Sequence, residues 1–124
     1  MNNINNQLTS LYAKNWPVFS QKLCELVISD NSIKPTNPLL LFVKDEDDYW
    51  NADIRVMIFG QETNDWGDDF NGDISNIVSI YEEFFSTGRC FRYGGQFWNG
   101  ISRFISMLKS SVGDKKVSFL WNNL

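Results

Sequence analysis

The chain has 124 residues, which is enough for one domain with a modest core. Apolar residues make up 43% of it and aromatic residues 15%, a globular composition that argues against disorder along the whole chain. The net charge of −4 argues against tight nonspecific binding of nucleic acid, although an acidic protein can still carry a local basic strip.

The residue types present narrow the chemistry further. The sequence contains no histidine, which excludes imidazole catalysis and histidine-based metal sites from this chain. Cys24 and Cys90 lack metal-ligand spacing and form no disulfide framework, so we expect a reducing, cytoplasmic setting. The N-terminus does not resemble a signal peptide, and no apolar run approaches the ~18 residues that span a bilayer. We expect no membrane partner, and no pattern indicates a metal or an organic cofactor.

Helical spacing dominates the first thirty residues. Apolar positions between Leu8 and Val27 recur at intervals of three and four, and Pro17 interrupts the pattern. We therefore expect one helix near 5–15 and a second near 17–28, with Pro17 in the first turn of the second helix.

Two short segments follow before the first confident strand. The apolar run Leu39–Val43 is expected to form a short strand or an extended segment packed on the core. The acidic run Asp45–Asp48 suggests either a metal site or a solvated turn. We favour the turn, because four acids in one short segment cannot converge on a metal without distant partners.

The second half of the chain alternates strands and helices. Apolar runs at Ile54–Phe59 and Val117–Trp121 predict buried strands. Between them, apolar residues at helical spacing predict amphipathic helices near 74–86 and 96–111. Strands joined by a helical crossover pair in parallel, so we expect a single α/β domain with a three-layer architecture, a parallel central sheet flanked by helices.

The predicted sheet has few strands. A parallel sheet of two or three strands has little area and bare edges. We therefore expect the fold to be incomplete, as the front portion of a larger domain, and expect self-association through an uncovered sheet edge.

Polar residues follow both predicted strands. Gln61–Asp65 come directly after the first strand, and Asn122 and Asn123 follow the second. Ligands bind at the carboxyl ends of the strands in an open parallel sheet, so both groups can face one cleft. Amides offer a donor and an acceptor together, which suits a nucleobase edge. On composition alone, these polar residues differ little from those found in most loops that follow a strand.

The first of these stretches resembles a known motif. V-M-I-F-G-Q-E-T at 56–63 resembles the first motif of the uracil-DNA glycosylase superfamily, an apolar strand followed by Gly-Gln-Asp-Pro-Tyr-His. Gly60 and Gln61 match, and Glu62 stands where the family has its water-activating aspartate. Residues 63–65, Thr-Asn-Asp, differ from Pro-Tyr-His.

Two weaker stretches follow in the family's order. G-R-C-F at 88–91 is similar to the family's Gly-Leu-Cys-Phe, although a whole helix separates it here from the first motif. S-F-L-W-N at 118–122 is similar to the family's Leu-Leu-Leu-Asn strand. The later His-Pro-Ser segment and the leucine wedge of the family are absent.

The resemblance, which spans roughly residues 50–124, implies a uracil-DNA-glycosylase-like fold of which this single domain, 1–124, is the front portion. The helical segment 1–30 lies at its N-terminus. It also implies DNA or a nucleobase as partner, base flipping, and Glu62 as the catalytic residue that orients water. The implied substrate-binding residues are Gly60, Gln61, Thr63, Asn64, Phe91 and Asn122. Without the histidine segment, we expect no base excision from this chain alone. A non-catalytic nucleotide- or protein-binding α/β module, or a small α/β protein unrelated to the family, remain open as alternatives.

Overall fold

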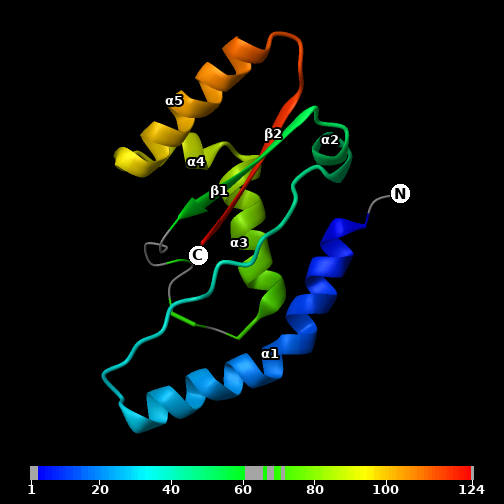
Figure 1. Ribbon diagram of the computed structural model, residues 1–124. Helices are drawn as coiled ribbons and strands as arrows, with labels where there is room; N and C mark the ends of the chain where they lie inside the picture. Colours follow the sequence, from blue (N-terminus) through cyan, green and yellow to red (C-terminus); the bar gives the residue numbers. More distant parts are fainter. Residues whose placement is uncertain (1–2, 61–65, 67–68, 71, 124) are drawn as a thin grey trace.

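Residues 3–60, 66, 69–70 and 72–123 are described by the computed structural model (Figure 1). The two strands and the two amphipathic helices between them occur in the order that the hydrophobic spacing predicts, and the mixed α/β character is confirmed. The elements are α1 (Ile4–Ser29), α2 (Glu46–Trp50), β1 (Ile54–Gly60), α3 (Ile74–Ser86), α4 (Arg89–Arg92), α5 (Gly95–Val112) and β2 (Val117–Asn123).

The two strands pair in parallel, as predicted. Ile54 lies opposite Val117 at the start of the ladder, and Gly60 lies opposite Asn123 at its end. The connection between the strands runs through α3, α4 and α5. The described residues therefore form a two-stranded parallel sheet with helices packed on it. The finer expectation of three full layers stays a prediction.

Aromatic side chains fill the core. The amphipathic helices α3 and α5 direct their apolar faces toward one face of the sheet, where Phe119 and Trp121 alternate along β2. The buried cluster consists of Trp66, Tyr81, Phe84, Cys90, Trp98, Ile101, Ile105 and Trp121. Residues 39–43 form an extended segment outside the sheet, in which Leu40 and Val43 are buried. Of the two predicted conformations for this segment, the extended one is thus confirmed.

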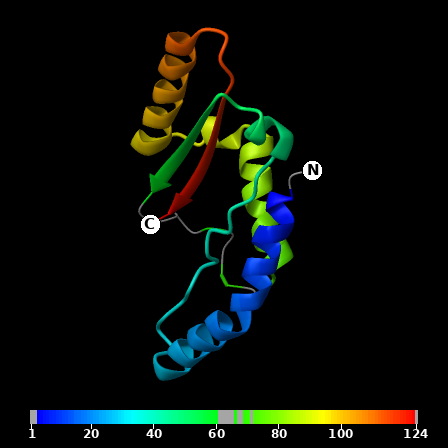
Figure 2. The same cartoon turned by 45° about the vertical axis from the view of Figure 1, so that its right-hand side comes forward.

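The N-terminal segment differs from the prediction. It forms one helix, α1, with Pro17 inside it instead of two helices that meet at Pro17. Both views show that α1 changes direction about half-way along (Figure 1 and Figure 2). Proline removes one helical hydrogen bond and clashes with the preceding turn, which bends a helix without always ending it. Trp16 and Phe19 explain why the helix continues, because both rings contact Phe70 and so hold the chain on either side of Pro17.

Contacts with distant segments hold the first half of α1 in place. The carboxylate of Glu46 accepts a hydrogen bond from the backbone N–H of Ile4 at 2.7 Å, which satisfies one of the free donors at the helix start. The Tyr12 hydroxyl donates to the carbonyl of Leu41 at 2.7 Å. These bonds tie α1 to α2 and to the extended segment, although no α1 residue is buried.

Short polar contacts begin two further helices. Asp45 accepts a hydrogen bond from the backbone N–H of Asp48 at 2.9 Å and caps α2. The acidic run therefore forms the single helical turn that the sequence favours. Asp73 caps α3 in the same way, through the N–H of Asn76 at 3.3 Å.

Tyr81 joins α3 to the outer edge of β2. Its hydroxyl donates to the carbonyl of Trp121 at 2.7 Å and accepts the backbone N–H of Trp121 at 3.1 Å. The backbone groups of Trp121 point away from β1, because alternate residues of a strand bond to opposite neighbours. One side chain thus satisfies both edge groups of Trp121. We refer to this arrangement as the Tyr81–Trp121 clip.

Removing the Tyr81 hydroxyl tests the importance of the clip. Tyr81→Phe leaves a buried donor and a buried acceptor of Trp121 without a partner, so we expect the free energy of unfolding to fall by about 1–3 kcal/mol in urea titrations. Tyr49→Phe is the matched control, since Tyr49 is only half-buried, with Arg55 over its ring, and the change should alter stability by less than about 0.5 kcal/mol. Equal stability of the two variants would contradict this role of Tyr81.

Alkaline pH should also weaken the fold. Burial raises the pKa of Tyr12 to about 12, above the value near 10 of an unfolded tyrosine. The folded chain therefore retains the proton more firmly, and stability falls as the pH rises from about 10 to 12. Urea midpoints measured across this range should decline less steeply for Tyr12→Phe than for the parent chain. An unchanged slope would show that Tyr12 does not contribute.

Candidate functional site

The carboxyl ends of both strands meet at one edge of the sheet. The last two registered pairs are Phe59 with Asn122 and Gly60 with Asn123. The expectation that Gly60 and Asn122 come together at this edge is therefore met by the register. The predicted site residues Gln61, Glu62, Thr63 and Asn64 lie outside the described residues, and their roles stay predictions.

Gly60 sits where neighbouring side chains approach the backbone of β1 very closely. A Cβ atom at this position would lie 2.7 Å from Asn123 Oδ1 and 3.0 Å from Trp121 Nε1. It would also lie 3.5 Å from Cζ of Phe97. Only glycine fits here without displacing the amide of Asn123, so the end of β1 is shaped by the absence of a side chain.

Polar atoms without partners gather around this glycine. Trp121 Nε1 and Asn123 Oδ1 are buried and make no hydrogen bond to any described residue, and the same holds for Trp66 Nε1. The Trp66 and Trp121 rings are in contact, with centroids 5.4 Å apart. A buried polar group without a partner destabilises a fold by about 1–3 kcal/mol, so such groups call for an explanation such as a functional role. We name Gly60, Trp66, Phe97, Trp121 and Asn123 the carboxyl-end cluster.

The two neighbouring asparagines have different surroundings. Side chains alternate along a strand, so Asn122 shares a face with its registered partner Phe59, which is 55% exposed. Asn122 Oδ1 accepts the backbone N–H of Asn123 at 2.9 Å. Asn123 instead shares the inner face with Trp121 and reaches Gly60. The resemblance to the glycosylase motifs places only Asn122 in the base pocket. Counting alternate positions from the apolar Trp121 would have identified Asn123 as well.

Phe91 lies away from this edge. Its ring contacts that of Phe119, with centroids 5.7 Å apart. Phe119 precedes Asn122 by three strand positions, or about 10 Å, and points to the opposite face. The structure thus does not bring Phe91 to Asn122, and its base-stacking role stays a prediction. Phe91 instead lines a separate cavity beside β2.

Neither a metal-binding cluster nor a membrane-spanning helix is found among the described residues. Among them, no group of three or more acidic or cysteine side chains is placed to hold a metal ion. No helix in the described part of the chain has the length and apolar character needed to cross a membrane.

No protein-family model, curated protein or solved structure matches this chain. The similarity of residues 56–63 to the first glycosylase motif therefore stays a hypothesis, and the site has to be interpreted from its own geometry. In the carboxyl-end cluster, neighbouring side chains approach the backbone of Gly60 closely. Trp121 and Asn123 offer a hydrogen-bond donor and an acceptor at the same place.

Two glycine substitutions test the close approach at Gly60. In Gly60→Ala the new methyl group must displace Asn123 and Trp121, so we expect a loss of about 1–3 kcal/mol in the free energy of unfolding. Gly100→Ala is the control, because no atom lies within 4 Å of its Cβ position and alanine favours a helix by up to about 1 kcal/mol. Urea unfolding should thus move in opposite directions for the two variants. A stable Gly60→Ala protein with unchanged tryptophan fluorescence would show that the approach is not tight.

Proposed function

We propose that this domain binds a nucleobase at the carboxyl-end cluster, as a uracil-DNA-glycosylase-like domain whose larger, three-layer fold this chain forms in part. One observation carries the proposal. A buried donor, Trp121 Nε1, and a buried acceptor, Asn123 Oδ1, both lie unpartnered among the described residues around Gly60. The parallel pairing of β1 and β2 supports it, because ligands of open parallel sheets bind where the strands end.

The chemistry of these two atoms fits the edge of a base. Indole Nε1–H only donates and the amide oxygen only accepts, and each nucleobase presents donors and acceptors side by side. Stacking of a base on an aromatic ring contributes about 1–3 kcal/mol, and Phe97 supplies a ring that is 43% exposed at this site. The net charge of −4 favours contacts to the base over contacts to phosphates.

Within the proposal, the predicted residues keep separate roles. Glu62 comes two residues after the end of β1 and would orient the attacking water, while Gln61, Thr63 and Asn64 would surround the base. Asn122 lies on the opposite face of β2 from Asn123, so within this proposal Asn123 takes over the contact to the base. The family's histidine segment stabilises the departing base, and this chain has no histidine. We therefore propose binding of a base by this chain, with excision only in an intact parent protein.

A second candidate is a non-catalytic protein-binding module. The observation that favours it is the outer face of β1, where Met57 is 41% and Phe59 55% exposed. Arg55 lies on the same face of β1, and its guanidinium is 5.3 Å from the ring centroid of Trp50. Trp50 is 42% exposed and so adds to this apolar surface. An exposed apolar strip of this kind is typical of surfaces that contact other proteins, including further copies of the chain.

Binding of nucleosides tests the first candidate directly. Uridine, inosine and thymidine are titrated against the protein while tryptophan fluorescence is recorded, because Trp66 and Trp121 lie in the cluster. We expect saturable quenching whose affinity changes little with salt, and a roughly tenfold loss in Asn123→Ala, which removes a buried hydrogen-bond acceptor. Asn99→Ala, at an exposed position of α5, is the control and should bind normally.

Three outcomes separate the candidates. If no nucleoside binds, or if Asn123→Ala binds as well as the parent chain, nucleobase binding at this cluster is wrong. Release of free uracil from uracil-containing DNA that is lost in Glu62→Gln would instead extend the proposal to catalysis by this chain. Association in sedimentation experiments that disappears in Phe59→Ser would favour the protein-binding module.

A further inference from the structure

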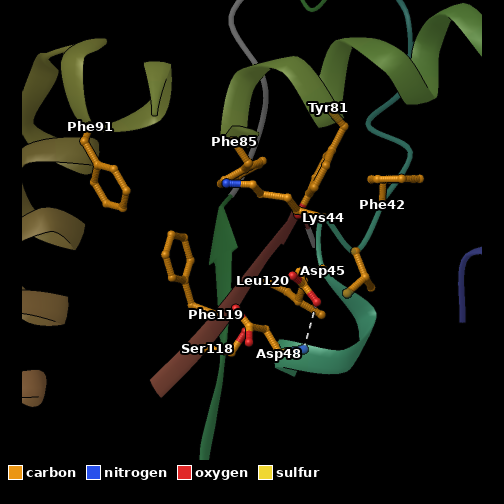
Figure 3. A pocket seen from close by; sticks show the side chains of 11 residues that line it. Phe42, Lys44, Asp45, Asp48, Tyr81, Phe85, Phe91, Ser118, Phe119 and Leu120 are labelled. Carbon is orange, nitrogen blue, oxygen red and sulfur yellow. Dashed lines mark hydrogen bonds between the residues drawn. The ribbon is translucent and has the colours of Figure 1, made fainter. Parts of the chain in front are cut away.

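A cavity of about 280 Å³ lies beside the middle of β2, and no residue of the carboxyl-end cluster lines it (Figure 3). Its walls come from the extended segment before α2, from α2, α3 and α4, and from Ser118–Leu120 of β2. The volume is just below the ~300–1,000 Å³ typical of ligand pockets, which suits a small ligand of amino-acid size. The cavity is therefore a second, independent candidate for ligand binding.

Aromatic rings form the apolar walls. Phe119 of β2 contacts Phe91 of α4 at 5.7 Å and Phe85 of α3 at 6.0 Å between ring centroids. Tyr81 packs on Phe85 at 4.6 Å. Phe91 is 43% exposed, so its ring is not fully covered by the protein's own side chains. Rings that converge from three elements, with Phe91 partly uncovered, favour a flat apolar body that packs against their exposed side.

Charges of opposite sign lie at different sides of this cavity. Figure 3 shows the nitrogen of Lys44 beside Phe85, whereas the carboxylate of Asp48 lies toward Ser118 and that of Asp45 toward Leu120. Within the described ranges, the single ion pair joins Lys22 and Glu25, so none of the three cavity charges is neutralised by a described partner within 4.0 Å. Only one oxygen of Asp45 is engaged, through the N–H of Asp48. The cavity thus combines an aromatic wall with one free cation and two free carboxylates, and the cation lies apart from the carboxylates.

We propose that this cavity binds a free amino acid with an aromatic side chain. The side chain of the ligand lies on Phe91 and Phe119. Its ammonium group faces Asp45 and Asp48, and its carboxylate faces Lys44. A ligand with one charge would contact either Lys44 or the two aspartates. An α-amino acid can contact both, because its ammonium and its carboxylate are attached to the same carbon as its side chain.

Three ligands of similar size separate the contributions of the two charges. Phenylalanine carries both charged groups, 2-phenylethylamine only the ammonium and 3-phenylpropionate only the carboxylate. In calorimetric titrations of the intact chain, we expect phenylalanine to bind roughly three- to tenfold more tightly than either single-charge ligand, because partly exposed ion pairs make contributions of that order.

Variants of the charged residues assign each group. Lys44→Met keeps the apolar stem and should reduce phenylalanine binding to the level of 2-phenylethylamine, whose own affinity should not fall. Asp48→Asn should weaken phenylalanine and 2-phenylethylamine but not 3-phenylpropionate. Asp47→Asn is the control, because Asp47 belongs to the same helical turn but does not line the cavity. Circular dichroism and thermal unfolding confirm that each variant is folded.

Several results would overturn the proposal. These are the absence of phenylalanine binding at millimolar concentration, equal affinity for all three ligands, or unchanged affinity in both folded variants. The inference is also independent of nucleobase binding. Asn123→Ala should leave phenylalanine binding intact, so the failure of one site is distinguishable from the failure of the other.

Discussion

Trp121 is the residue on which the rest of the structure depends. Its ring contacts those of Trp66, Tyr81, Phe84, Phe85 and Trp98, which belong to α3, α5 and the segment after β1. Its backbone is held by the Tyr81 hydroxyl on one side. Because the same side chain brings Nε1 to Gly60, the packing that joins the helices to the sheet also fixes the geometry of the carboxyl-end cluster.

The two candidate sites share β2 but use different parts of it. The middle of the strand, around Phe119, faces the cavity, and its end carries the amide of Asn123. The sites differ in chemistry as well. One presents unpartnered donors and acceptors of neutral groups, whereas the other has free charges of both signs, Lys44 against Asp45 and Asp48. Ligands of different classes are therefore expected at the two sites.

Local patterns in the sequence predict much of this fold. The apolar run of β1 and the amphipathic spacing of α3 act through neighbouring residues, and both elements are found where predicted. The continuity of α1 across Pro17 was not predictable, because it depends on contacts with Phe70 far along the chain. In the site, the register of the strand ends followed from topology. The separation of Phe91 from Asn122 depends on tertiary packing that no motif encodes.

The Tyr81–Trp121 clip affects how the outer edge of β2 could pair with a strand of another molecule. The outer edge of β2 presents backbone groups at Val117, Phe119 and Trp121, and an exposed strand edge is a template for further pairing. At Trp121 the tyrosine hydroxyl already occupies both hydrogen-bonding positions. A foreign strand can therefore extend along this edge only as far as Phe119 before it meets the side chain. The hydroxyl thus closes the Trp121 end of this edge to further strand pairing.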